Sequence, residues 1–228
     1  MTTVKRWTLR VGLVVLVGAM GVAVAELATT QSSQPASALP PPVLKGGKSL
    51  EEVLAARRSV RSFAPTALTA EQIGQLCWAA QGVTEPKRGL RTAPSAMAKY
   101  PLDLYVITAE GVGRYVPAGH AMEKRVEGDA LATLRASAGR QRAIAQAPAV
   151  FVFAADPSRM GGRMPELAEQ WVDLEVGHAA QNLLLQATAL GLGGVPVGAF
   201  DAAAVGELIQ LPEGQQVRYL IPVGEPAK

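Results

Sequence analysis

Residues 174–200 read LEVGHAAQNLLLQATALGLGGVPVGAF and carry the strongest structural pattern of the chain. The apolar residues from Trp171 to Leu190 predict a long helix, and Gly191 is the expected C-terminal cap. A glycine-rich turn follows, formed by Gly193, Gly194, Pro196 and Gly198. Glycines let a backbone approach a planar ligand closely, so this turn is expected to border a binding site. It lacks the strand-first GxGxxG order and the P-loop lysine, which argues against those two kinds of nucleotide site.

The rest of the chain reads as helices with a few strands. Capping-box spacing predicts two helices, at 49–60 (Ser49 with Glu52) and at 69–82 (Thr69 with Gln72). Branched and aromatic residues predict strands at 102–108, 149–155 and 217–224, and residues 127–146 indicate one or two further helices. Helices do not separate these strands in regular βαβ order. The pattern therefore favours an α+β layer structure over a doubly wound sheet.

Composition narrows the functional classes. A chain of 228 residues with 49% hydrophobic content is long enough for one ordinary domain with a core. The net charge is only +3 and the basic residues form short groups, so nucleic acid is not an expected partner. The single cysteine, Cys77, excludes an internal disulfide and is expected to be a buried thiol on a helix. No metal-ligand spacing occurs, and no metal site is predicted.

The N-terminal residues differ from the rest. Residues 1–25 have a basic start, an uncharged apolar run and small residues at Ala23 and Ala25, which predicts a signal peptide. Residues 26–47 are rich in Pro, Ser, Thr and Ala and are expected to form a flexible tether before a folded domain at 48–228. These features predict export to the periplasm or the outside. A retained signal would instead anchor the protein in a membrane, although its apolar run is short for a span.

The sequence RRSVR at residues 57–61 places three arginines and a serine at the expected end of the first helix. Guanidinium groups pair phosphate oxygens bidentately and a hydroxyl can donate to a further oxygen, so this group is a candidate phosphate site. Its members are Arg57, Arg58, Ser59 and Arg61. The alternative is that the cations only complement the helix dipole and stay solvated.

A second candidate segment, RTAPSAMAKYPLDLYVIT at residues 91–108, sets a loop of small residues before a strand. The small side chains and Pro94 leave backbone amides open to a flat or charged group. The loop is therefore expected to be kept clear for a ligand.

Few titratable residues are candidates for catalysis. Glu175 and His178 lie three residues apart on the long helix, and a structural, hydrogen-bonded His178 is favoured over a general base. His120 lies in an expected turn and is interpreted as solvated. No hydrolase motif occurs. No catalytic residue is therefore assigned, and the pattern indicates an enzyme whose chemistry comes from an organic cofactor.

Four motifs in this order and spacing resemble the nitroreductase family of flavoproteins, and most of all its branch of SagB-type dehydrogenases: RRSVRSF, APSAMAKYPLDLYVI, LEVGHAAQNLLLQATALGLGGVPVGAF and VRYLIPVGEP. The resemblance covers residues 49–226. It implies a nitroreductase-like mixed β-sheet flanked by helices, a homodimer, and FMN bound between the two chains. NAD(P)H and a small-molecule electron acceptor would take turns at the flavin.

The resemblance also implies roles for individual residues. Arg57, Arg58 and Ser59 would hold the FMN phosphate, and Arg61 would lie near the pyrimidine end of the ring, where a cation favours the negatively charged reduced state. Pro94 and Ser95 match a loop contributed by the partner chain. The segment whose backbone approaches the flavin consists of Pro196, Val197, Gly198 and Ala199.

Two departures from the family pattern bear on function. The azoline-oxidising branch would carry a Lys-Tyr pair ahead of the long helix, where this chain has Arg163 and Met164. Glu225 stands where many relatives carry a basic residue. The expected function is therefore two-electron reduction of nitroaromatic, quinone or similar acceptors. Oxidation of a peptide azoline is the alternative, and a non-catalytic flavin-binding or scaffold protein is a third interpretation.

Overall fold

The computed structural model describes residues 36–137, 141–162 and 165–228, and a seven-stranded sheet organises them. Its strand order is β1-β6-β5-β4-β7-β9-β8, with antiparallel ladders. The strands are β1 (Ser37–Ala38), β4 (Leu102–Thr108), β5 (Gly111–Val116), β6 (Ala121–Glu127), β7 (Ala149–Ala155), β8 (Gly193–Gly194) and β9 (Gln216–Gly224). A parallel contact appears at the isolated bridge between Ser59 and Gly194. The α+β prediction is confirmed, and within the described residues the mixed character of the sheet is limited to that bridge.

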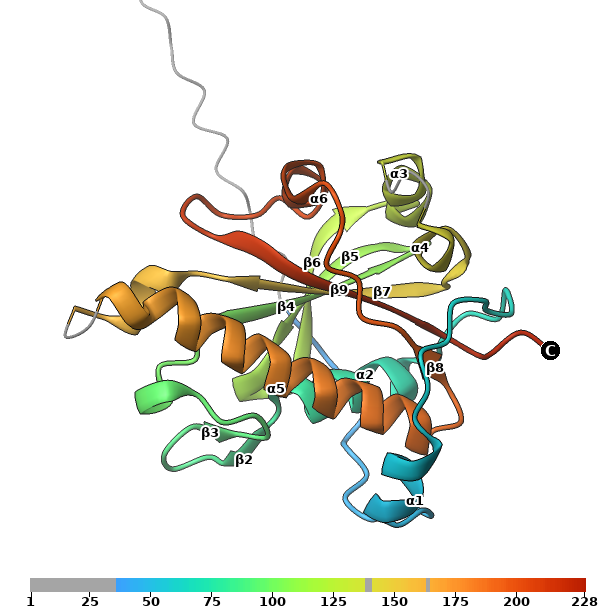
Figure 1. Ribbon diagram of the computed structural model, residues 1–228, viewed down its shortest axis with the longest axis horizontal. Helices are drawn as coiled ribbons and strands as arrows, with labels where there is room; N and C mark the ends of the chain where they lie inside the picture. Colours follow the sequence, from blue (N-terminus) through green and yellow to red (C-terminus); the bar gives the residue numbers. More distant parts are fainter. Residues whose placement is uncertain (1–35, 138–140, 163–164) are drawn as a thin grey trace, which may run out of the picture. The chain divides into compact units, whose positions relative to one another are not determined.

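Helices cover both faces of this sheet, as Figure 1 shows. Two of them, α2 (Ala70–Gln81) and α5 (Ala168–Ala189), pack on one face through the cluster that contains Leu76, Val172 and Leu183. The opposite face carries α3 (Ala130–Ser137), α4 (Arg142–Gln146) and α6 (Ala202–Leu208). Alternation along the strands divides the side chains between the two layers: Leu104 and Phe151 lie in the first cluster, Tyr105 and Val152 in the second.

Local sequence signals set the helix boundaries. Ser49 and Glu52 form the predicted capping box of α1 (Leu50–Ala56), and Thr69 and Gln72 form that of α2. Leu190 is the C-cap of α5, and Gly191 follows it with φ of 76°, as a left-handed C-terminal residue should. The two helices expected within residues 127–146 are α3 and α4.

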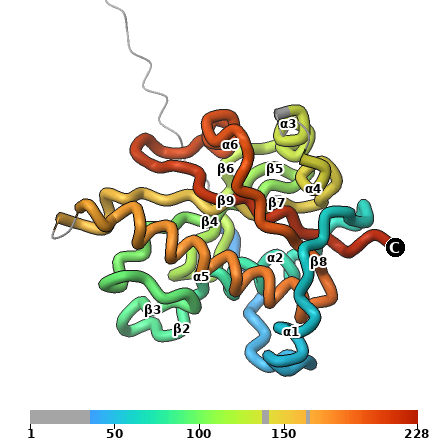
Figure 2. The backbone as a smooth tube through the Cα atoms, viewed as in Figure 1, coloured from blue at the N-terminus to red at the C-terminus, as the bar shows by residue number. Residues whose placement is uncertain are grey.

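The structure differs from the expectation of a flexible tether for residues 36–47. Strand β1 pairs with β6, and the Leu39 N–H donates to the His120 carbonyl at 3.0 Å. Further along, the Gln75 side chain accepts from the Val43 N–H at 2.7 Å and donates to the Val43 carbonyl at 3.1 Å. In Figure 2 this blue segment leads past α2 into α1. The predicted signal peptide, residues 1–25, lies outside the described residues.

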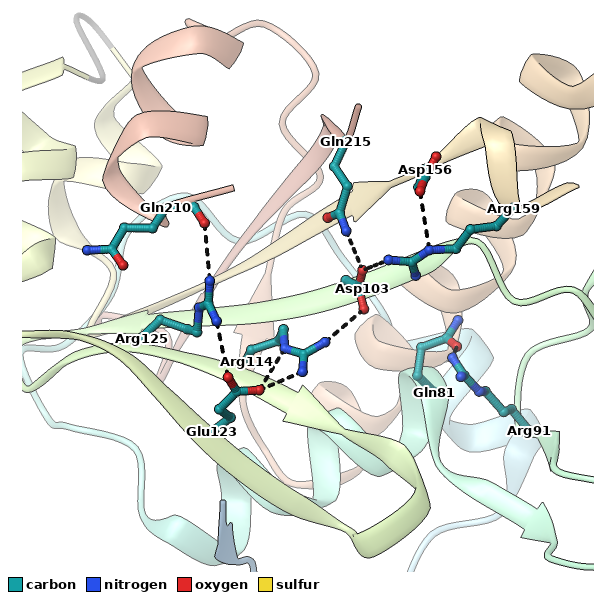
Figure 3. A network of polar contacts seen from close by, with 10 residues as sticks. All are labelled: Gln81, Arg91, Asp103, Arg114, Glu123, Arg125, Asp156, Arg159, Gln210 and Gln215. Carbon is teal, nitrogen blue, oxygen red and sulfur yellow. Dashed lines mark hydrogen bonds and ion pairs between the residues drawn. The ribbon is translucent and has the colours of Figure 1, made fainter. Parts of the chain in front are cut away.

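Strands β5 and β6 were not predicted, because charged residues interrupt their apolar pattern. Arg114 of β5 and Glu123 of β6 are direct partners across the ladder, and the Arg114 Nε donates to Glu123 at 3.0 Å. Asp103 of β4 accepts from Arg159 at 2.7 Å and pairs with Arg114 at 3.5 Å. Figure 3 shows this network, which joins three neighbouring strands through side chains. Ion pairing thus replaces apolar contact on this part of the sheet.

Candidate functional site

The RRSVR segment leaves the helix sooner than expected. Helix α1 ends at Ala56, and Arg57 turns the chain out with φ of −56° and ψ of 122°. The Val60 N–H then donates to the Gly194 carbonyl at 3.1 Å. Residues 59–61 therefore run extended beside β8, where alternate side chains point to opposite sides. The helix predicted for residues 49–60 is therefore shorter than expected, and Arg57 and Arg61 lie beyond its end.

The three arginines of the segment have different surroundings. Arg58 uses its Nη1 to donate to the carbonyls of Ala55 and Arg57, at 2.9 and 2.8 Å, so it caps the end of α1. Among the described residues, the side chains of Arg57, Ser59 and Arg61 have no hydrogen-bond or ion-pair partner, and Ser59 and Arg61 are exposed. The interpretation as a helix cap thus fits Arg58, while the other side chains remain open to a ligand.

The glycine-rich turn divides into a packed part and an open part. A Cβ atom added at Gly193 would lie 2.5 Å from a Val60 methyl group, so the close approach at this glycine is to the chain itself. Gly194 is also enclosed, by Leu184 and Pro222. These two glycines therefore do not need a ligand to explain them, contrary to the expectation. Gly198 is exposed, and the nearest atom to its added Cβ would be 3.8 Å away, on Tyr219.

The predicted binding residues 196–199 come shortly after β8, in the open part of this turn. Val197 exchanges backbone hydrogen bonds with Leu220 of β9, at 2.8 and 3.1 Å, which fixes the path of the segment. Pro196 precedes it, and the exposed residues Gly198 and Ala199 follow. Because Ser59 bridges Gly194, the structure brings the RRSVR segment to the start of the same turn.

The loop that carries Pro94 and Ser95 is held in an uncommon backbone conformation. Met97, Ala98 and Tyr100 all have φ between 50° and 54°, in the region that side-chain-bearing residues seldom adopt. The Ser95 Oγ accepts from the Tyr100 N–H at 2.8 Å and stabilises this turn. Such strain persists only where the surroundings enforce it, and it is common at ligand sites.

Within one chain, Ser95 of this loop and the RRSVR segment lie at different ends of α5. Ser95 faces Glu175, in the first half of α5, whereas β8 follows the far end of that helix after Leu190. Fifteen residues of helix separate those two positions, roughly 22 Å at 1.5 Å per residue. The hairpin of β2 (Val83–Glu85) and β3 (Leu90–Arg91) leads into the loop. In Figure 1 this hairpin lies by the first half of α5, and α1 lies by its other end. The predicted binding residues thus form two separate groups.

Glu175 is a buried carboxylate that the sequence did not assign to the site. It is 2% exposed, and among the described residues neither of its carboxylate oxygens has a hydrogen-bond partner. Burial raises its pKa to about 7, against the opposing influence of Ser95, Arg91 and Gln81. The pattern contained a signal for it, since Glu175 shares a helical stripe with the buried residues Val172 and Ala179. A carboxyl that titrates near neutrality is a frequent mark of a functional site.

The two histidines and the cysteine are not among the residues that face Glu175. His178 is exposed and its side chain has no hydrogen-bond partner among the described residues, so the expectation of a structural, hydrogen-bonded histidine is not met. His120 bonds Tyr115 through Nδ1 at 2.9 Å and the Pro40 carbonyl through Nε2 at 2.8 Å, which corrects the expectation of a solvated side chain. Cys77 is fully buried, and burial raises its pKa, as expected for a structural thiol. No metal-binding group of His, Cys, Asp and Glu occurs among the described residues.

Comparison with known proteins assigns the chain to a family. Residues 54–225 match the sequence profile of the nitroreductase family. A candidate nitroreductase of Methanocaldococcus jannaschii is 39% identical over 77% of this chain and 90% of its own. The crystal structure of a candidate nitroreductase from Ralstonia eutropha has a TM-score of 0.78 at 32% identity, covering 86% of this chain and 92% of that one. The NADPH-flavin oxidoreductase of Vibrio harveyi is 31% identical over 77% of this chain, which spans 65% of that protein.

The predicted export or membrane anchoring is corrected by these relatives. The chain matches nine tenths of the length of two nitroreductases, and none of the three relatives is described as exported or membrane-bound. The apolar run that gave the prediction precedes the matched residues 54–225. Between residues 36 and 228, as far as they are described, no helix has the length and apolarity needed to cross a bilayer.

The family match spans all the segments of the candidate site. The matched range takes in the RRSVR segment, the loop of Ser95, helix α5 and the turn after β8. The layered arrangement of helices around the antiparallel sheet is shared with the Ralstonia structure. The chain therefore belongs to the nitroreductase family and is an oxidoreductase.

Proposed function

We propose that this chain is an FMN-dependent oxidoreductase that reduces nitroaromatic, quinone or similar small acceptors by two electrons and works as a homodimer. FMN would supply the hydride chemistry when bound. The chain's own residues would bind the cofactor, orient it and leave one of its faces open. NAD(P)H is the proposed electron donor, supported by the NADPH-flavin oxidoreductase among the relatives.

The observation that carries this proposal is the open group around the RRSVR segment. The side chains of Arg57, Ser59 and Arg61 have no partner among the described residues, and the bridge of Ser59 to Gly194 sets them at the start of the exposed Gly198–Ala199 turn. Guanidinium and hydroxyl donors fit a phosphate, and the uncluttered backbone of Gly198 fits a flat ring. In this proposal Arg58 contributes positive charge while it caps α1.

The separation of the two predicted groups supports the proposed homodimer. Ser95 lies near Glu175 in the first half of α5, whereas the RRSVR segment lies beyond the other end of that helix, so a complete site would take this loop from a second chain. Helix α5 also has an exposed face that includes Leu174, which is 53% exposed, and Gly177. Apolar and small residues on the open face of a long helix suit contact with another copy of the helix.

The SagB-type dehydrogenase is a weaker proposal. Oxidation of an azoline requires a positioned base that removes a carbon-bound proton, in addition to hydride transfer. The expected Lys-Tyr pair is replaced by Arg163 and Met164, which lie outside the described residues. Arginine stays protonated and methionine does not titrate, so this pair cannot be the base. Reduction of an acceptor needs little more than an aligned, stacked substrate.

The test is to purify the protein and to measure its visible spectrum, its mass in solution and its flavin content. We expect a yellow dimer that releases FMN on denaturation and reduces a quinone or nitroaromatic with NAD(P)H. A thiazoline-containing peptide should leave the oxidised flavin unchanged under anaerobic conditions. A colourless monomer that rejects added FMN would refute both the cofactor and the dimer. Bound FMN that neither NAD(P)H nor the peptide reduces would favour a non-catalytic flavin protein.

A further inference from the structure

Glu175 lies where a carboxylate is costly. It is on the face of α5 that packs toward α2 and the sheet, between the buried residues Val172 and Ala179, and it is 2% exposed. The amide Nε2 of Gln81, which is 1% exposed, also lacks a hydrogen-bond partner among the described residues. Two buried polar groups without partners rarely persist in a protein core unless they have a role.

The neighbours of Glu175 connect it to the loop that carries Ser95. The Ser95 hydroxyl faces Glu175 and accepts from the Tyr100 N–H, so its own proton is available to the carboxyl group. Gln81 also faces Glu175, and its Oε1 accepts from Arg91 at 2.7 Å. Arg91 begins the loop and Tyr100 ends it. The residues that face Glu175 therefore belong either to the loop of residues 91–100 (Arg91 and Ser95) or to α2 (Gln81).

Burial favours the neutral form of Glu175 and outweighs the opposing effect of the nearby charge. Arg91 is the cation that faces it, but this guanidinium already donates to Gln81 and lies over the Tyr100 ring. The groups on the elements packed around this pair are Asp103 of β4, Tyr115 of β5 and the buried Cys77 of α2. On α5 itself, Glu169, Asp173 and His178 are exposed. A neutral carboxyl group can accept hydrogen bonds from Ser95 and Gln81 without placing an uncompensated charge in the core. An ionised carboxylate is instead stabilised by contact with water.

We propose that Glu175 is a positioning residue whose bound proton keeps the 91–100 loop packed against α5. When Glu175 loses this proton, the loop opens more often, because opening admits water to the carboxylate. The proposal rests on the proposed function in one respect: the loop carries Pro94 and Ser95, which would contact the flavin of the partner chain. Proton binding and flavin binding would then both favour the closed loop and strengthen each other.

Thermodynamic linkage between proton binding to Glu175 and opening of the loop sets how strongly the opening depends on pH. The pKa of Glu175 is about 7 with the loop closed, and its ordinary value is 4.5. If the open loop restores the ordinary value, the open population rises about tenfold between pH 6 and pH 8.5. Hydrogen exchange of the backbone amides of residues 91, 98, 99 and 100 reports this opening directly, since these amides are hydrogen-bonded inside the loop.

The experiment compares hydrogen exchange of the whole, flavin-free protein with that of Glu175→Gln, after correction for intrinsic exchange at each pH. In the unmodified protein the loop amides should exchange about tenfold faster at pH 8.5 than at pH 6. Glu175→Gln, which resembles the protonated side chain, should keep slow exchange at both. Glu169→Gln is the matched control, because it makes the same change at an exposed position of the same helix. Equal pH dependence in the unmodified protein and in Glu175→Gln would overturn the proposal, as would loop exchange that slows with rising pH.

Two further measurements keep the outcome clear. The affinity for FMN should fall with rising pH more steeply in the unmodified protein than in Glu175→Gln, while the titration of the FMN phosphate is common to both. Failure of every protein to bind FMN would refute the proposed function, and the exchange data would still decide the role of Glu175. Should Glu175→Gln not fold, carbon-13 NMR of glutamate carboxyl groups in the unmodified protein replaces it. A carboxyl titrating near pH 7 together with the loop amides supports the proposal, and its absence refutes it.

Discussion

Arg91 lies over the ring of Tyr100, with its guanidinium carbon 4.5 Å from the ring centroid, while the Arg91 N–H donates to the Tyr100 hydroxyl at 3.1 Å. One tyrosine thus closes the loop twice, once through its ring and once through its hydroxyl. The backbone at Tyr100 has φ of 50°, so the loop needs these contacts to hold an unfavourable conformation.

Replacing Tyr100 should separate the two contacts. Tyr100→Phe keeps the ring and removes the hydroxyl, so we expect a loss of about 1 kcal/mol in the free energy of unfolding. Tyr100→Leu also removes the cation–π contact and should cost about 0.5–1 kcal/mol more. Urea unfolding of both variants measures the difference. Equal stability of the two would show that the ring of Tyr100 contributes nothing beyond its bulk.

Glu175→Gln should change the pH dependence of stability. Folding raises the pKa of Glu175 from 4.5 to about 7, so its favourable contribution is fully present below pH 4.5 and is lost as the pH rises through 7. Glutamine has no such dependence. Relative to the unmodified protein, the variant should therefore gain on the order of 2 kcal/mol between pH 5 and pH 8. Denaturation at the two pH values tests this, and a constant difference between the two proteins would show that Glu175 does not titrate in this range.

Much of the fold could be read from the sequence because its signals are local. The capping boxes at Ser49 and Thr69 and the C-terminal Gly191 depend on a few neighbouring residues, and the structure has all three. The apolar strands β4, β7 and β9 were likewise predictable. Strands β5 and β6 were not, because Arg114 and Glu123 stabilise them through ion pairs that leave no apolar alternation.

The candidate site was less predictable because its geometry depends on distant contacts. Helix α1 stops before Arg57 although the sequence could continue the helix, since Val60 bonds to Gly194 from the far end of the domain. The glycine at position 193 looked like a ligand contact and instead makes room for Val60. Glu175 is one of three acidic residues of α5, with Glu169 and Asp173, and its link to Ser95 appears only in the fold.

Substitutions of Arg57 and Arg61 in the RRSVR segment should affect different properties of the bound flavin. Arg57→Ala would remove a charge-assisted phosphate contact of about 1.5–3 kcal/mol, so FMN affinity should fall roughly ten- to a hundredfold. Arg61→Ala should mainly lower the reduction potential of the bound flavin, because a cation near the ring favours the reduced state. Titration with FMN and potentiometry measure the two effects.

Arg58→Ala is the matched control for those variants. Its Nη1 bonds to Ala55 and Arg57 cap an exposed helix end, so its loss should lower stability by no more than roughly 1 kcal/mol and leave the reduction potential unchanged. Its effect on FMN affinity should be smaller than that of Arg57→Ala. An equal fall in affinity for both variants would mean that Arg58 leaves the cap to bind the phosphate.

Two glycines of the turn after α5 should respond oppositely to alanine. At Gly193 the new Cβ would lie 2.6 Å from the Val60 Cβ and 2.5 Å from its methyl group, so β8 and the RRSVR segment must move apart. That shift weakens the hydrogen bond from the Val60 N–H to the Gly194 carbonyl, and we expect a loss of roughly 1–3 kcal/mol in the free energy of unfolding.

At Gly198 the nearest atom would be 3.8 Å away, an ordinary contact, so Gly198→Ala should leave the free energy of unfolding within about 0.5 kcal/mol of the original. If the backbone there approaches the flavin, the same methyl group must still collide with the ring, and FMN affinity should fall in a protein whose fold is intact. Urea unfolding and FMN titration of both variants decide the matter: Gly198→Ala with unchanged FMN affinity would remove the Gly198–Ala199 segment from the proposed site.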